Sequence, residues 1–156
     1  MRLVVVAVGA GQPSWVEEAF DEYAKRLPRE MRVELVEVRA EARSTGKPVA
    51  ALLAAEAKRV EASIPRSALR VVLDERGREV DTRALARLMA RWREGGRDVA
   101  FLIGGPDGLA GDVKESADIA LRLSSLTLPH GLARVILAEA LYRAASVLGR
   151  HPYHRE

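Results

Sequence analysis

Residues 3–8 read Leu-Val-Val-Val-Ala-Val, a continuous apolar run close to the start of a chain of 156 residues. Successive side chains of a strand point to opposite faces of its sheet, so a run without polar residues predicts a strand covered on both faces. Strands of this kind are typical of a mostly parallel sheet with helices packed on both sides. The run therefore predicts an α/β fold.

The rest of the chain continues this pattern, because short apolar runs alternate with segments of helical periodicity. The apolar runs predict four more strands, at residues 33–38, 69–73, 99–103 and 120–123. Apolar residues three and four apart predict helices at residues 14–27, 49–62, 82–94, 112–117 and 132–148. The third strand is expected to end at Asp74, with a turn through Gly77. We expect a single domain over residues 1–156, in which a mostly parallel sheet is flanked by helices.

Polar residues predict where two of these helices begin. Ser14 and Glu17 have the spacing of a capping box, in which each side chain accepts a backbone N–H at the start of a helix. Asp81 or Thr82 can cap the helix that follows the third strand.

Composition narrows the classes of protein. The formal net charge is +3, and the basic residues are mostly arginine, whose planar guanidinium suits phosphate contacts. The preference for arginine, together with the lack of asparagine and cysteine, equally fits a GC-rich genome or a hot habitat. The lack of cysteine excludes disulfides and thiolate chemistry. With no apparent signal peptide or membrane span, the protein is expected in the cytoplasm.

Three turns are expected at the carboxyl ends of the strands, where parallel sheets bind their ligands. They follow Leu73, Ile103 and Leu123. The second turn, Gly104–Gly108, lets backbone approach a ligand closely, or is simply a tight turn. The third, Leu123–His130, offers backbone amides and carbonyls to a ligand, or is an ordinary strand-to-helix connection. Because the chain has no G-x-x-x-x-G-K-[ST] or G-x-G-x-x-G motif, a ligand without phosphates is favoured.

A charged loop is expected at residues 39–48. Its cations, Arg39, Arg43 and Lys47, could contact phosphate. The alternative is a solvated loop with no ligand.

The last seven residues, Arg-His-Pro-Tyr-His-Arg-Glu at 150–156, concentrate side chains suited to RNA chemistry. Tyr153 can stack on a base, while Arg150 and Arg155 can contact phosphates. His154 can accept or donate a proton. The alternative is a frayed basic terminus.

Two other features of the C-terminal region have simple alternatives. In the last helix, Glu139 and Arg143 stand four residues apart, which fits either a solvated helix edge or a groove between subunits. His151 and His154 have no nearby cluster of histidine, cysteine or carboxylate, so no metal site is expected.

Several motifs together resemble a known family over nearly the whole chain. They are Val6–Gly9 with Pro13, Trp92–Asp98, Leu102–Pro106, Leu123–His130, Glu139 with Leu141–Ala144, and His151–Glu156. In their order and in the tail, they resemble the small SPOUT-superfamily enzymes called ribosomal RNA large subunit methyltransferase H. These enzymes methylate N3 of a pseudouridine in helix 69 of 23S rRNA. The chain departs from the family pattern at Gly131 and Ala145, which puts only details of helix packing in doubt.

The resemblance implies a C-terminal trefoil knot, a homodimer and S-adenosyl-L-methionine bound by the knot loops. It places the cofactor against the residues that also follow the three strand ends: Leu73, Gly104, Leu123, Ser124, Ser125, Leu126, Thr127 and Leu128. The partner would be 23S rRNA in the large subunit or the whole ribosome, without a membrane or a metal. The tail of one subunit would complete the active site of the other.

Within this composite site, residue types suggest roles. His154 is the preferred proton acceptor, and Tyr153 and Arg155 would place the base and a phosphate. Substrate contacts of second rank are expected from the side chains of Arg143, His130 and Arg150.

Two rival functions stay open at this point. A noncatalytic ribosome-binding or assembly module would use the same arginines and tail without a cofactor. A nucleotide-dependent enzyme of flavodoxin-like topology would bind flavin or nucleotide instead.

Overall fold

The computed structural model describes residues 1–150 and 153. The strands are β1 (Leu3–Val8), β2 (Val33–Val38), β3 (Leu69–Glu79), β4 (Val99–Ile103) and β5 (Ile119–Arg122). The helices are α1 (Ser14–Ala24), α2 (Val49–Ser63), α3 (Thr82–Gly95), α4 (Gly111–Glu115) and α5 (His130–Leu148). Two short 3-10 turns, η1 (Arg29–Met31) and η2 (Arg43–Thr45), precede β2 and α2.

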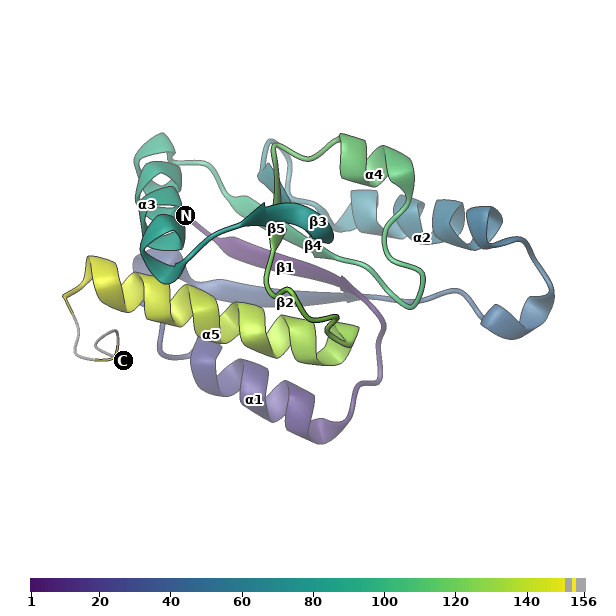
Figure 1. Ribbon diagram of the computed structural model, residues 1–156, viewed down its shortest axis with the longest axis horizontal. Coiled ribbons are helices and arrows are strands. Elements are labelled where there is room, and N and C mark those ends of the chain that lie inside the picture. The colour runs from purple at the N-terminus through teal and green to yellow at the C-terminus, as the bar shows by residue number, and fades with distance from the viewer. Residues whose placement is uncertain (151–152, 154–156) are drawn as a thin grey trace.

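The five strands form one parallel sheet in the order β2-β1-β4-β3-β5. Val5 of β1 lies between Leu35 of β2 and Phe101 of β4, and Phe101 in turn pairs with Val71 of β3. All parallel strands leave the sheet at the same edge, so the loops after β3, β4 and β5 come together there (Figure 1).

The sheet separates two apolar cores. Leu3, Val5 and Ala7 face the core that is closed by α1, α3 and α5, whereas Val4 and Val6 face the core under α2 and α4. Figure 1 shows α1 and α5 on one side of the sheet and α2 and α4 on the other, with α3 at the left end of the molecule. Every residue of β1 and β4 is buried, which explains why both segments are apolar throughout.

The predicted α/β fold with a parallel sheet and flanking helices is confirmed, and three strands have the predicted bounds. The predicted end of the third strand is wrong. Instead of turning away at Gly77, β3 continues to Glu79 and shifts its register, so that both Leu73 and Arg78 oppose Leu121. Gly77 permits this because it rests on the backbone of Leu121, where a Cβ would lie 2.5 Å from the Leu121 carbonyl carbon.

The two predictions for helix starts have different outcomes. The capping box is wrong, since Ser14 already lies inside α1 and the N-cap Pro13 makes no side-chain cap bond. Pro13 presets the backbone for helix entry and leaves no place for a serine cap. The cap of α3 is confirmed, because the Asp81 carboxylate accepts the N–H of Ala84 at 2.7 Å.

The C-terminal trefoil knot stays a prediction, with which the strand order and the position of α5 are compatible. Among residues 1–150 and 153, no helix has the length and apolar character needed to cross a membrane.

Candidate active site

A cleft of about 720 Å³ opens at the carboxyl ends of β3, β4 and β5. Its walls are formed by these strand ends and the loops after them: Leu73–Glu75, Ile103–Leu109, Lys114, Arg122–Ser124, Leu126–His130 and Ala133. The volume falls within the range of roughly 300–1,000 Å³ that is usual for small-molecule sites. The three turns that the sequence singled out therefore meet in one cavity.

The structure brings most of the predicted cofactor residues together in this cleft. Ser125 is the exception, because it is exposed and does not line the cavity. The Ser124 hydroxyl accepts the N–H of Leu126 at 2.9 Å, which folds the connection back at this point. Leu126 lines the cleft and is 76% exposed. His130, predicted as a substrate contact, also lines the cleft.

Charged groups on the cleft wall were missed by sequence reasoning. Asp74 at the end of the β3 wall accepts the N–H of Arg76 at 2.8 Å and the Lys114 ammonium at 2.9 Å. These two donors, the backbone N–H first, hold the pKa of Asp74 below its usual range. Lys114 belongs to α4, forty residues after Asp74, and no local sequence pattern indicates that these two side chains pair.

The glycine-rich loop after β4 is tightly folded. Gly108 donates its N–H to the carbonyl oxygen of Gly105 at 3.0 Å. A Cβ on Gly104 would lie 2.4 Å from the Gly108 carbonyl carbon, so only glycine fits at this position. At Gly104 and Gly105 the loop thus presents backbone to the cleft beside Ile103.

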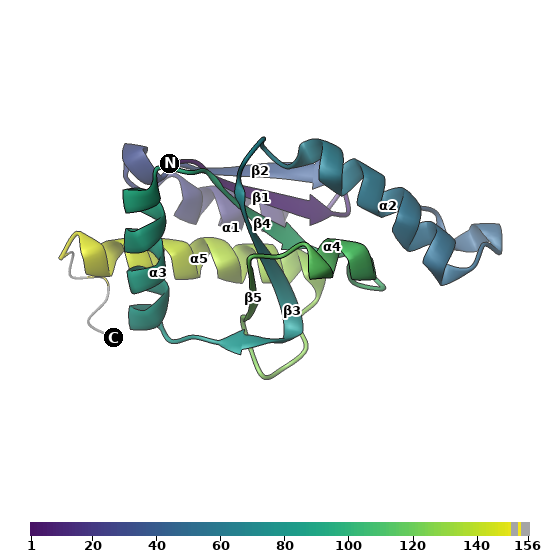
Figure 2. The ribbon, with the colours of Figure 1, turned by 90° about the horizontal axis from the view of Figure 1, so that it is seen from above.

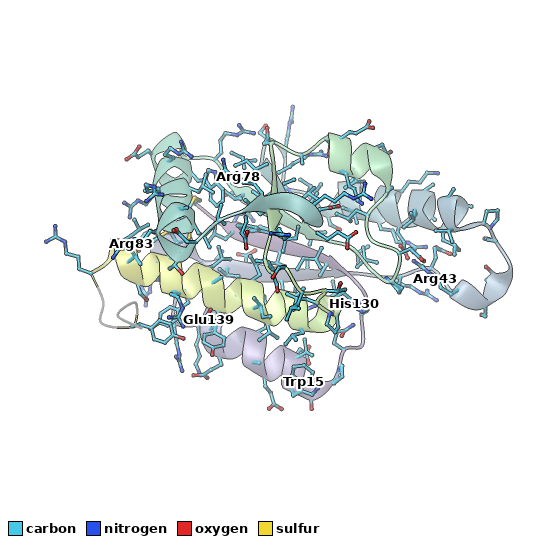
Figure 3. The ribbon with its side chains drawn as sticks, in the orientation of Figure 1. Trp15, Arg43, Arg78, Arg83, His130 and Glu139 are labelled. Carbon is cyan, nitrogen blue, oxygen red and sulfur yellow. The ribbon has the colours of Figure 1, made fainter. Side chains whose placement is uncertain are left out.

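Arg43 joins the predicted charged loop to the glycine-rich loop. Its guanidinium donates to the Glu56 carboxylate at 2.6 Å and to the Asp107 carboxylate at 3.0 Å (Figure 3). Glu56 is only 2% exposed and also accepts the N–H of Glu41 at 2.8 Å. Arg43 is therefore not the freely solvated cation of one sequence interpretation, because its side chain ties Glu56 to Asp107 on the cleft wall.

Replacing Arg43 with alanine is expected to lower the free energy of unfolding by about 2 kcal/mol, because it leaves the buried Glu56 carboxylate without its cation. Urea denaturation followed by circular dichroism measures the change. The control is Lys47→Ala on the same loop, an exposed position that should stay within about 0.5 kcal/mol of the unmodified protein. Equal losses in the two variants would contradict a structural role for the tie.

The first residue of α5, His130, lies where the cleft meets the loop after β1. Its imidazole packs close to Gly9: a Cβ on Gly9 would lie 3.4 Å from the imidazole and 3.3 Å from the side-chain nitrogen of Gln12. One turn later, the fully buried Arg134 donates to the Gly9 carbonyl and to the Glu37 carboxylate, both at 3.0 Å. Burial, and secondly the Arg134 cation, lower the pKa of His130.

This shift predicts a pH dependence of stability. Below the ordinary pKa of 6.5, the unfolded chain binds a proton at His130 that the folded protein still excludes. The contribution to stability is therefore complete above pH 6.5 and is lost as the pH falls through the lower folded pKa. Between about pH 7.5 and pH 5.5, a His130→Gln variant should lose less unfolding free energy than the unmodified protein in urea titrations. Equal losses would show that the neutral imidazole contributes nothing.

A second group of predicted residues gathers at the other end of α5. The Tyr153 hydroxyl donates to the Glu139 carboxylate at 3.2 Å, and Arg143 donates to the same carboxylate at 2.8 Å. The Tyr153 ring lies 4.5 Å from the Tyr142 ring and 5.0 Å from the Arg143 guanidinium carbon. Burial, and secondly the Glu139 charge, raise the pKa of Tyr153, so its hydroxyl is a neutral donor at pH 7.

The two groups are far apart in one protomer. Arg143 follows His130 by thirteen residues of a continuous helix, or about 20 Å along the axis. Figure 3 shows His130 and Glu139 well separated along α5. Arg150 is exposed in the turn after α5, and the predicted roles of His154 and Arg155 lie outside the described residues. The structure therefore brings Tyr153 to Arg143 but not to the cleft.

The described side chains show no group for binding a metal ion. Across residues 1–150 together with 153, no three histidine, cysteine or carboxylate side chains are close enough to share one.

A parallel α/β sheet whose cleft is built from three strand-end loops defines a class of small-molecule-binding folds. The family described as "Predicted SPOUT methyltransferase" matches residues 1–154. The chain belongs to this family, and within it to the ribosomal RNA large subunit methyltransferase H proteins. Proteins of that name from Bordetella petrii and Leptothrix cholodnii are 57% and 56% identical to it, over 99% and 100% of both chains respectively. The protein from Methylibium petroleiphilum is 58% identical over the full length of both.

Solved structures show the same fold at low sequence identity. A probable methyltransferase from Bordetella pertussis superposes with a TM-score of 0.58 and 21% identity, over 92% of this chain and 95% of that one. A probable rRNA-methyltransferase from Porphyromonas gingivalis gives a TM-score of 0.56 and 16% identity, over 94% and 69%.

Proposed function

We propose that this protein transfers a methyl group from S-adenosyl-L-methionine to N3 of a pseudouridine in helix 69 of 23S rRNA. One domain spanning residues 1–156 would act in the cytoplasm as a homodimer on the large subunit or the whole ribosome. The observation that carries the proposal is the cleft, because the predicted cofactor residues other than Ser125 converge there. The names of the curated relatives support the ribosomal substrate.

The residues of the cleft fit the proposed cofactor. S-adenosyl-L-methionine has a flat aromatic purine with a polar edge, a cationic sulfonium and no phosphate. Leu73, Ile103 and Leu128 offer apolar walls, and the loop at Gly104 offers backbone hydrogen-bonding groups. The carboxylates of Asp74 and Asp107 on the wall are each paired with a cation, Lys114 and Arg43 respectively, so they balance the basic side chains at the cleft. Neither a metal nor a phosphate-binding loop is required.

The bound cofactor would supply an activated methyl group, and the protein would align the acceptor with it. Held by the cleft residues, the cofactor would give up its methyl carbon to N3 and leave as S-adenosylhomocysteine. The N3 proton passes to His154, while Tyr153 and Arg155 hold the base and a phosphate. Alignment of this kind contributes up to roughly 7–11 kcal/mol.

The distance along α5 supports a site that two protomers share. Arg143 lies about 15 Å along α5 from Ala133, the last residue of the helix that lines the cleft, and neither Arg143 nor Tyr153 lines the cleft of its own chain. In a dimer they would instead reach the cleft of the partner, together with Arg150. This arrangement gives roles to both ends of the helix.

The rival function is a ribosome-binding module without a cofactor. Calorimetry with S-adenosyl-L-methionine separates the two, since the module would release no heat. Mass mapping of 23S rRNA from a strain that lacks the protein tests the substrate and the position. Loss of one methyl group at helix 69, restored by adding the protein, is the expected result. An unchanged modification pattern would refute the proposal.

The glycine-rich loop offers a direct test of the cofactor site. Gly104→Ala places a Cβ against the Gly108 backbone, so the loop must move and affinity for S-adenosyl-L-methionine should fall by up to about 10²-fold. Gly111→Ala is the matched control, because that position has open space around it and should keep normal affinity. Calorimetry measures both. Unchanged affinity in Gly104→Ala would show that the loop is not part of the cofactor site.

A further inference from the structure

The outer side of α3 is strongly cationic. Arg83, Arg87 and Arg91 are exposed and stand four residues apart, so they form one row with a spacing of about 6 Å along the helix axis. The first turn of the helix has no acidic residue, and Glu94 in the last turn is its one exposed carboxylate. Together with Arg78 at the end of β3, these side chains form what we call the arginine face.

No carboxylate neutralises the arginine face. The ion pairs between described residues use other arginines, such as Arg2, Arg43 and Arg70, and none includes a member of the face. Like charges four residues apart destabilise a helix by a few tenths of a kcal/mol per pair. Arg83 also lies at the positive end of the helix dipole, where the N-cap carboxylate of Asp81 is the nearest negative charge in sequence. The row is therefore unfavourable in the isolated protein, and an anionic partner would relieve the repulsion.

A groove lies beside the row. It has a volume of about 490 Å³, with Arg78, Arg87 and Arg91 on its rim and Val80, Ala84 and Leu88 among its apolar lining. The one carboxylate that lines it, Glu79, already accepts the Arg122 guanidinium at 2.9 Å. The groove thus keeps a net positive rim around a partly apolar floor, which suits a sugar–phosphate strand.

The position of the face relates it to the proposed active site. Helix α3 packs against α5, and both views show it crossing the half of α5 that is remote from the cleft (Figures 1 and 2). Figure 3 places Arg83 beside that end of α5. Arg143 and Tyr153 belong to the same end. The face therefore adjoins the residues that would enter the partner's cleft.

We propose that the arginine face binds the phosphate backbone of the ribosomal RNA next to the methylated nucleotide. The inference rests on the proposed function for the identity of the RNA. A membrane is a poorer partner, because the large apolar side chains that the described residues expose, Trp15, Val49 and Leu126, all lie away from α3. The row follows a charged strand without reading its bases, so the contact would supply affinity rather than sequence selection.

The test is the salt dependence of binding to large ribosomal subunits purified from a strain that lacks the protein. The variant R83Q/R87Q/R91Q removes three charges, and glutamine retains the helix propensity of arginine. Each lost phosphate contact reduces the slope of log K against log salt by roughly 0.7–0.9, so the slope should fall by about 2. Affinity near 0.1 M salt should fall at least about tenfold.

Two further variants make the result specific. R29Q/K58Q/R66Q removes the same charge from exposed, unpaired positions elsewhere and should keep the normal slope. R83K/R87K/R91K keeps the charge and should also keep it, which guards against an effect of misfolding. Equal slopes for the glutamine variant and the control set would overturn the proposal, whether both are normal or both reduced.

The salt dependence of binding to the large subunit does not depend on catalysis. Calorimetry with S-adenosyl-L-methionine should give the same affinity for R83Q/R87Q/R91Q and the unmodified protein. If the unmodified protein binds subunits but methylates none, the proposed function is wrong. The slope of log K against log salt for R83Q/R87Q/R91Q still tests whether the arginine face binds RNA.

Discussion

A heterodimer of two inactive variants is expected to recover about half of the methylation rate of the unmodified dimer. The first variant, Leu128→Arg, introduces a bulky cation into the cleft proposed to hold the cationic sulfonium. The second, Tyr153→Ala, removes the ring that packs against Tyr142 at the far end of α5. In the heterodimer, the intact cleft of one chain meets the intact tail of the other, so one of two sites works.

The reason for recovery is geometric. Arg143 follows Ala133, the last residue of α5 that lines the cleft, by ten residues or about 15 Å along the axis, and neither Arg143 nor Tyr153 lines the cleft of its own chain. Two affinity tags isolate the heterodimer, and methylation is measured on ribosomes from a strain that lacks the protein. Each homodimer should be inactive while eluting as a folded dimer.

An inactive heterodimer would mean that each cleft depends on the tail of its own chain. Elution of the protein as a monomer at working concentration would refute the composite site.

Replacing His154 with alanine should slow methyl transfer by about 10²–10⁴-fold, the usual range for removal of a general base. The loss should shrink at high pH, where solvent hydroxide can remove the N3 proton without a protein base. Single-turnover methylation across a pH series measures the effect on the chemical step. Affinity for the cofactor should not change.

The control for this substitution is His151→Ala, which removes a histidine three residues away that has no proposed role. It should retain nearly the normal rate. A His154→Ala variant that keeps the full rate at every pH would eliminate His154 as the proton acceptor, although the shared site would stand.

The sequence predicted the sheet well because β1 and β4 are continuous apolar runs and β2 is rich in valine and leucine. The bounds of β1, β2 and β4 agree to the residue, since each run is flanked by glycine or charged residues. The extension of β3 could not be foreseen. It depends on the backbone of Leu121 lying against Gly77, a contact between segments that only the folded sheet brings together.

The candidate site was predicted in outline for the same reason. Parallel strands bring their carboxyl ends to one edge, so three separate turns could be assigned to one cleft. The ties that stabilise the cleft were not predicted. Arg43 and Asp107 are sixty-four residues apart in sequence, and Arg43 looked like one of several loop cations. Charge spacing alone does not indicate which of these cations will meet a buried carboxylate such as Glu56.

Helix α5 links the two parts of the proposed site as a rigid spacer. It begins with His130 at the cleft and runs unbroken for nineteen residues to Leu148, just before the tail. Insertion of one residue would advance its far end by about 1.5 Å and rotate it by about 100°. Such a change would move Arg143 and Tyr153 away from the positions in which they would reach the partner's cleft. The length of α5 therefore sets the spacing between the two parts of the proposed site. Natural variation can substitute residues along the helix but cannot insert or delete them.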